Sequence, residues 1–180
     1  FALAISGRIV PNGAIRLTIC ARGGAREAMD TTHEREDDGW IALPEVHGGC
    51  QCGALRYRVT AGPGFASICH CRMCQRATGG PFAALLKVAE DRVTWLGTPA
   101  VFRSSNIAER GFCPACGTPL FYRAIGSGMI ELTQGSLAPE VPFVPVRQWG
   151  VEGRQRWLDG LDIPGARTTE RDVIPRQAPE

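Results

Sequence analysis

The spacing of its cysteines constrains this chain more than any other feature of the sequence. Seven of the eight cysteines fall into three short motifs. Thiolates two or three residues apart on a tight turn can point at one ion about 2.3 Å away, and tetrahedral sulfur coordination is what zinc takes. The motifs are Cys50-x-Cys52, Cys69-x-Cys71-x-x-Cys74 and Cys113-x-x-Cys116. The sequence therefore predicts two zinc ions.

The way the seven sulfurs are shared decides which site is reactive. Two short pairs from distant parts of the chain make a closed structural site, and Cys50, Cys52, Cys113 and Cys116 suit it. The triplet Cys69, Cys71 and Cys74 then supplies three ligands and leaves the fourth tetrahedral position to water or substrate. An alternative partition joins Cys69 and Cys71 to the first pair and leaves Cys74 with Cys113 and Cys116.

A disulfide framework is another use for many cysteines. Such scaffolds are mostly shorter than about 80 residues and carry an export signal. This chain has 180 residues, and its first residues offer only a short apolar run, without a basic segment before it. No segment approaches the ~18 apolar residues of a membrane span. We expect a reducing, cytoplasmic setting and no membrane partner, while iron in place of zinc stays an open alternative.

The charge of the chain argues against a nucleic-acid partner. The formal net charge is +2 with neutral cysteines. Seven bound thiolates and two Zn²⁺ ions lower this by three, to about −1. Nucleic-acid binding calls for a basic stripe and a high pI. A nearly neutral holoprotein is not expected to bind nucleic acid.

The middle of the chain has the pattern of an all-β fold. Leu55, Tyr57 and Val59 alternate with polar residues, which is the period of a half-buried strand. Residues 75–80 are expected to hold one helical turn, and the prolines at 142 and 145 argue against a central strand at 141–146. Further short apolar runs, separated by turn residues, occupy 82–88, 93–96, 101–103, 120–123 and 129–133.

The two ends differ from the middle in composition. Residues 1–28 show no sustained period, and residues 30–39 are too polar to pack. We predict a disordered or extended leader over 1–44, a zinc-binding domain over 45–163 and a polar tail over 164–180. Met29 is a candidate start, in which case Cys20 would not be made.

Three sequence blocks resemble the glutathione-dependent formaldehyde-activating enzyme family, whose domain also occurs in centromere protein V. The resemblance covers about residues 46–163 and includes all seven grouped cysteines. It implies a β-tent of small antiparallel sheets, a structural zinc on the four-cysteine set and a catalytic zinc on Cys69, Cys71 and Cys74. The blocks are GGCQCGALRY at 48–57, CHCRMCQRATGGPF at 69–82 and FCPACGTPL at 112–120.

The same resemblance implies an activity. The family's reaction joins formaldehyde to the thiol of glutathione, giving S-hydroxymethylglutathione, a carbon–sulfur lyase step when written in reverse. Zinc lowers the pKa of a substrate thiol, and three thiolates leave the ion electron-rich, which favours delivery of the thiol over strong Lewis acidity. The expected partners are a thiol, glutathione by resemblance, and an aldehyde. The alternative is a non-catalytic, zinc-stabilised binding module.

Other candidate residues are few. His70 has three candidate roles: packing, a hydrogen bond that supports the metal ligands, or proton transfer. His47 and Cys20 are spare candidates for a fourth ligand. Lys87, the only lysine, is expected at the surface rather than in Schiff-base chemistry. Gly53 and Gly117 each follow a cysteine, where a zinc-binding turn often needs positive φ. Three arginines are expected either to be solvated at the surface or to pair with the carboxylates of glutathione: Arg56, Arg72 and Arg76.

Overall fold

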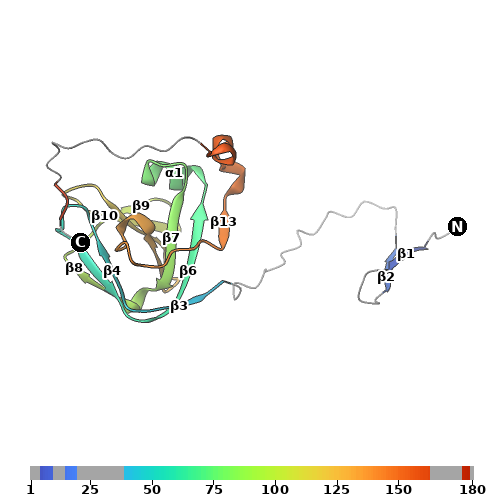
Figure 1. The fold of residues 1–180 in the computed structure, drawn as a ribbon, viewed down its shortest axis with the longest axis horizontal. Coiled ribbons are helices and arrows are strands. Elements are labelled where there is room, and N and C mark those ends of the chain that lie inside the picture. The colour runs from blue at the N-terminus through green and yellow to red at the C-terminus, as the bar shows by residue number, and fades with distance from the viewer. Residues whose placement is uncertain (1–4, 10–14, 20–38, 163–175, 179–180) are drawn as a thin grey trace. The chain divides into compact units, whose positions relative to one another are not determined.

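The computed structural model describes residues 5–9, 15–19, 39–162 and 176–178 (Figure 1). The chain separates into two compact units, Phe1–Arg35 and Glu36–Glu180. Our predictions for Cys20, Met29 and residues 164–175 lie outside the described residues. None of the helices in the described ranges has the length and apolar character needed to cross a membrane.

The first unit contains a hairpin that the sequence analysis did not predict. Strand β1 (Ile5–Ile9) pairs antiparallel with β2 (Ile15–Ile19), and Ile5 lies opposite Ile19. The intervening residues include Pro11-Asn12-Gly13, a strong turn signal. In β2, Ile15, Leu17 and Ile19 alternate with Arg16 and Thr18, a period of two that the sequence analysis missed when it found no sustained period over residues 1–28.

A large sheet forms the second unit's main layer (Figure 1). Its eight strands follow the order β13-β6-β7-β12-β11-β10-β9, with β3 also paired to β6. The strand pairings are antiparallel, as predicted, except that β13 pairs parallel to β6. The strands are β3 (Ile41–Leu43), β6 (Gly62–Cys69), β7 (Ala83–Ala89), β9 (Ala100–Arg103), β10 (Ala108–Phe112), β11 (Pro119–Ala124), β12 (Met129–Thr133) and β13 (Arg147–Trp149).

A smaller antiparallel sheet supplies the other wall of the core. It consists of β4 (Val46–Gly49), β5 (Arg56–Val59) and β8 (Val93–Leu96) in that order. The alternation predicted for residues 55–59 places Tyr57 and Val59 in the core, where Tyr57 contacts the Trp95 ring edge-on at 5.0 Å. Apolar burial between the two sheets is the main force holding them together. The core joins these side chains to Leu86, Val88, Leu120, Ile130 and Leu132.

One short α-helix stands beside the strands in the described ranges, so this part of the chain is mostly β, as predicted. Helix α1 (Arg72–Thr78) begins three residues before the predicted turn, because Cys71 caps its first turn through its sulfur. Residues 141–146 form no strand, as their prolines indicated. Four 3₁₀ segments complete the described elements: η1 (Glu90–Arg92), η2 (Gln134–Ser136), η3 (Val151–Gly153) and η4 (Arg156–Gly160).

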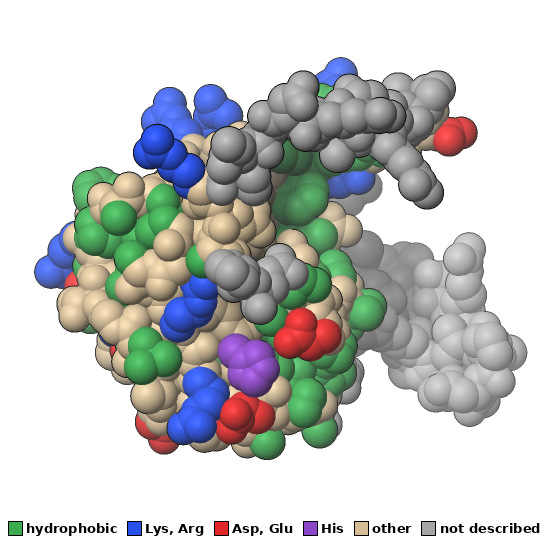
Figure 2. Space-filling model, turned by 60° about the vertical axis from the view of Figure 1, so that its left-hand side comes forward, with side chains coloured by type: hydrophobic (Ala, Val, Ile, Leu, Met, Phe, Trp, Pro, Cys, Tyr) green, Lys and Arg blue, Asp and Glu red, His purple; other side chains and the backbone are tan. Residues whose placement is uncertain are grey.

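On the face shown in Figure 2, the distribution of charge does not single out one class of ligand. Basic, acidic and hydrophobic side chains are interspersed there. Among the ion pairs, Lys87 on β7 lies 3.8 Å from Glu131 on the neighbouring β12. Lys87 is therefore an ion-paired residue of the large sheet and lies outside both cysteine groups.

Candidate metal and active site

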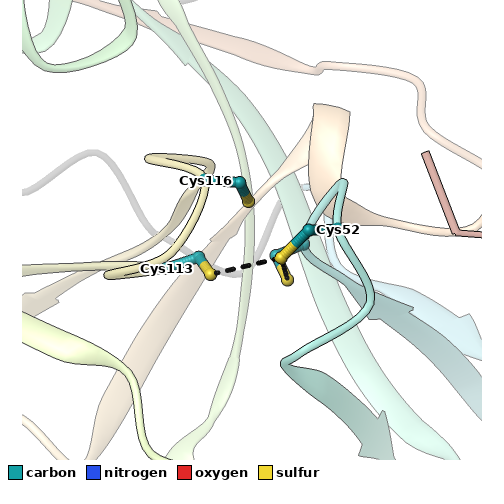
Figure 3. A group of neighbouring side chains, drawn as sticks. Cys52, Cys113 and Cys116 are labelled. Atoms are coloured by element: carbon teal, nitrogen blue, oxygen red, sulfur yellow. Dashed lines mark hydrogen bonds between the residues drawn. The ribbon is translucent and has the colours of Figure 1, made fainter. Parts of the chain in front are cut away.

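Four of the cysteines converge from two loops that are distant in sequence. Cys50 and Cys52 lie between β4 and β5, and Cys113 and Cys116 lie between β10 and β11 (Figure 3). All four sulfurs lie within 4.8 Å of one another. The Cys50–Cys52 and Cys52–Cys113 sulfur distances are 3.6 Å and 3.9 Å. Sulfurs arranged tetrahedrally at about 2.3 Å from zinc are about 3.8 Å apart, so this group fits a metal ion.

Local backbone geometry holds the two loops in this shape. Gly53 has φ +80° and Gly117 has φ +76°, which confirms the positive values predicted after the ligand cysteines. The Leu55 amide donates to Cys50 Sγ at 3.2 Å, and Arg56 Nη1 donates to the Cys50 carbonyl at 2.9 Å. Arg56 is thus engaged with the loop that carries the first pair.

These hydrogen bonds also set the acidity of the thiols. Burial raises the pKa of Cys50, but the Leu55 amide and neighbouring thiols outweigh it and leave that pKa lowered. Burial opposes the lowering at Cys116 too, where the Thr118 hydroxyl and amide bring the pKa down to about 6. At Cys52 the Ala54 amide lowers the pKa, but the Cys116 and Cys50 thiols outweigh it and raise that pKa to about 11. Cys50 and Cys116 are therefore the thiols that favour the thiolate, which is the form that binds metal.

The other three grouped cysteines meet where β6 passes into helix α1. Cys69 is the last residue of β6, Cys71 is the N-cap and Cys74 lies in the first turn. The Cys74 amide donates to Cys71 Sγ at 3.4 Å, so the helix start fixes the spacing of two sulfurs. The three sulfurs lie within 4.8 Å of one another. Among the described residues, no fourth cysteine, histidine or carboxylate joins this group.

Arg110 on β10 is the cation at the three-cysteine group. Its Nη2 donates to Cys74 Sγ at 3.3 Å, and its guanidinium lies 5.1 Å from the centre of the Tyr122 ring. The Cys69 thiol and Arg110 together lower the pKa of Cys74 to about 5, against the effect of burial. The hydrogen bond to Cys74 raises the pKa of Cys69. A thiolate is therefore stabilised at Cys74.

A segment from the far end of the unit secures the turn that carries these cysteines. The His70 amide donates to the Trp149 carbonyl at 2.8 Å, and His70 Nε2 lies 2.8 Å from Gln148 Oε1. Gln75 Nε2 donates to the carbonyls of His70 and Gly153, both at 2.8 Å. We name residues 148–153 the strap. His70 is 2% exposed and its imidazole faces the strap, which matches packing and hydrogen bonding among its predicted roles.

The structure separates the two cysteine groups as the spacing predicted. The alternative partition, with Cys69 and Cys71 joined to the first pair, is not the one observed. His47 lies outside the three-cysteine group, and its Nε2 is 3.9 Å from Glu140 Oε1 at the surface. Arg72 Nη1 donates to Gln75 Oε1 at 3.0 Å, whereas Arg76 is exposed.

Sequence reasoning missed the residues that the fold brings to the three cysteines. Arg110 lies 36 positions from Cys74 and Gln148 lies 78 positions from His70. Neither residue belongs to a motif. The only sequence signal for the strap is the pair Gly150 and Gly153, whose lack of a side chain allows close approach to Cys71 and His70.

Comparison with known proteins identifies similar chains. The family model described as glutathione-dependent formaldehyde-activating enzyme matches residues 45–151. An uncharacterized lyase of Schizosaccharomyces pombe is 32% identical over 80 residues, which cover 44% of this chain and 58% of that protein. The crystal structure of a Rhodobacter sphaeroides protein aligns with a TM-score of 0.47 and 21% identity, covering 57% of this chain and 98% of the other.

Proposed function

Because the chain belongs to the glutathione-dependent formaldehyde-activating enzyme family, we propose that it is a zinc-dependent carbon–sulfur lyase acting on a thiol–aldehyde adduct. Its reaction in the synthetic direction is then the addition of glutathione to formaldehyde. The relative named a lyase supports the reaction class. The observation that carries the proposal is the three-cysteine group, to which the described part of the chain supplies no fourth ligand.

The two cysteine groups have different roles in this proposal. Cys50, Cys52, Cys113 and Cys116 would hold a structural zinc, because four protein sulfurs leave no position for a substrate. Cys69, Cys71 and Cys74 would hold the catalytic zinc. Zinc held by three cysteines would supply an open coordination position and lower the pKa of a substrate thiol.

The reaction itself needs little from the protein beyond positioning and charge. The thiol sulfur forms a bond to the carbonyl carbon, the carbonyl π bond breaks, and the oxygen takes the proton that the thiol gave up. Arg110 holds Cys74 as a thiolate, and the strap fixes the turn through His70 and Gln75. Fixed groups of this kind reduce the reorganisation that the reaction requires. A reducing cytoplasm, which keeps the seven thiols free, is part of the proposal.

Zinc quantitation and exchange spectroscopy together test the proposal. Wild-type protein should hold two zinc ions and speed the exchange between formaldehyde and glutathione. Cys71→Ser should lose one zinc and the exchange activity. It should stay folded, because the three-cysteine group lies on one local turn and does not link distant segments of the chain. If fully zinc-loaded wild type and Cys71→Ser give the same exchange rate as buffer, the lyase proposal is wrong and a non-catalytic module takes its place.

A further inference from the structure

A cavity adjoins the three-cysteine group. It has a volume of about 300 Å³ and is lined by residues of helix α1 and of strands β7, β9, β10, β11 and β12. Arg110 lines it and contacts Cys74, so this side chain connects the cavity to the three-cysteine group, none of whose cysteines is among the described lining residues. Gly117, next to Cys116, also lines it, so the cavity extends toward the four-cysteine loop. The described residues that line the cavity include no cysteine of either group.

The wall of the cavity is apolar with a single charge. Four aromatic residues line it: Phe102, Phe112, Phe121 and Tyr122. Among its described lining residues, Arg110 is the only charged one. The lining hydroxyls of Thr78 and Thr133 already donate to backbone carbonyls, at 3.0 Å and 2.6 Å. A ligand here would contact rings and meet one cation, at the end nearest Cys74.

The size and polarity of the cavity indicate which reactant it takes. A cavity of about 150 Å³ holds benzene, and formaldehyde is far smaller than the space available here. Glutathione carries two carboxylates and an ammonium group, whose burial against this wall would be costly without partners. We propose, on the basis of the lyase function above, that the aldehyde substrate carries an aryl or branched alkyl group that occupies this cavity, with its oxygen at Arg110.

The chemistry of this aldehyde is that of the proposed addition. The thiol sulfur bonds to the carbonyl carbon, and the oxygen gains the electron pair of the π bond and then the proton released by the thiol. Arg110 carries several N–H donors, of which one contacts Cys74. A second donor aimed at the aldehyde oxygen would stabilise the negative charge that develops there. No oxidant or reductant enters the step.

Binding of an unreactive analogue tests the cavity apart from catalysis. 4-Fluorobenzamide has the aryl group and the carbonyl oxygen, and ¹⁹F NMR reports its binding to zinc-loaded protein. Ala77→Phe fills the cavity from helix α1 and should weaken binding at least tenfold, or about 1.4 kcal/mol. Arg110→Gln should weaken it about tenfold through loss of a charged donor. Phe102 is 63% exposed, so Phe102→Ala should fold normally, and it should weaken binding about threefold.

Matched changes outside the cavity serve as controls. Met73→Phe enlarges an exposed residue of the same helix, and Arg76→Gln removes a charge from it; neither residue lines the cavity. Both should leave binding within about twofold of wild type. Equal affinity for wild type, Ala77→Phe and Phe102→Ala, or no binding by wild type, would overturn the proposal.

Turnover measurements distinguish failure of the larger-aldehyde proposal from failure of the lyase function. Ala77→Phe should keep exchange of formaldehyde with glutathione and lose exchange of 4-fluorobenzaldehyde. If wild type exchanges formaldehyde but neither binds the amide nor exchanges the aryl aldehyde, the larger substrate is excluded while the lyase function stands. If the amide binds but no aldehyde is exchanged, the lyase function fails, and the assignment of the cavity to a substrate fails with it.

Discussion

Single residues of the strap decide how closely it approaches the three-cysteine turn. Gly150 has φ +59°, and a Cβ added there would lie 2.8 Å from the Cys71 amide nitrogen. A side chain would therefore strain the backbone and push against the residue that caps helix α1. His70 depends on the same segment, since its amide and its Nε2 are both bonded to it.

Gly150→Ala should lower the free energy of unfolding by about 1–3 kcal/mol and weaken zinc binding at the three-cysteine group. Thermal unfolding and a chelator titration measure the two effects. Gly160→Ala is the matched control, because a Cβ at Gly160 meets nothing within 4 Å. Equal zinc affinity in the two variants would show that the strap does not support the metal site.

The grouping of the cysteines was predictable from the sequence, whereas the residues that contact them were not. Cysteines suited to one metal ion can be recognised in the sequence because they lie close together on the same turn, as Cys71 and Cys74 do. Arg110 carries no such signature, because its place beside Cys74 depends on the pairing of β10 within the sheet. A contact made by tertiary pairing leaves no local pattern in the chain.

Among the elements, the four-cysteine group joins the β4–β5 loop of the small sheet to the β10–β11 loop of the large one. Cys113 is fully buried and belongs to the hydrophobic core. Loss of one ligand thus affects both the metal site and the packing between the sheets. A structural zinc contributes on the order of 10 kcal/mol in small zinc domains.

Cys113→Ser should lower the free energy of unfolding by more than about 3 kcal/mol and remove the structural zinc, because three sulfurs cannot close the site. Zinc quantitation and thermal unfolding of the soluble fraction measure this. Ala115→Ser, an exposed change on the same loop, controls for the added hydroxyl. A Cys113→Ser protein with two zinc ions and an unchanged melting temperature would refute the structural assignment.

The strands that the sequence predicted are those with an apolar period, such as β5 with Tyr57 and Val59. Strand β6 escaped prediction because it begins Gly-Pro-Gly, which is typical of a turn, while its pairing with β3 at residues 62–64 makes it extended. Strand β10 escaped because Glu109 and Arg110 interrupt its apolar pattern. Glu109 pairs with Arg123 on β11, with 2.6 Å between Oε2 and Nη2.

For the whole chain, the division into two units bears on which residues the metal sites need. Both cysteine groups lie in the unit Glu36–Glu180. The predicted domain start at 45 leaves out β3, which pairs with β6 in the large sheet. The predicted polar tail contains one described stretch, in which the Ala178 amide donates to the Gln51 carbonyl at 2.8 Å.

Removal of residues 1–35 should leave both metals bound and the melting temperature within about 2 °C, because the second unit has its own core. Removal of residues 165–180 should cost about 1 kcal/mol through loss of the Ala178–Gln51 hydrogen bond. Zinc content and calorimetry of both shortened chains measure this. Loss of zinc on removal of residues 1–35 would show that the first unit supports the metal sites.

The most direct test of two unlike metal sites, one closed and one open to a thiol, is ¹¹³Cd NMR of the cadmium-loaded protein with and without glutathione. Cadmium takes the same sulfur ligands, and its chemical shift responds to a change of ligand. We predict two resonances, of which only one moves when glutathione is added, and Cys71→Ser should lack that one. Two resonances that both stay in place with excess glutathione would contradict an open, thiol-binding site.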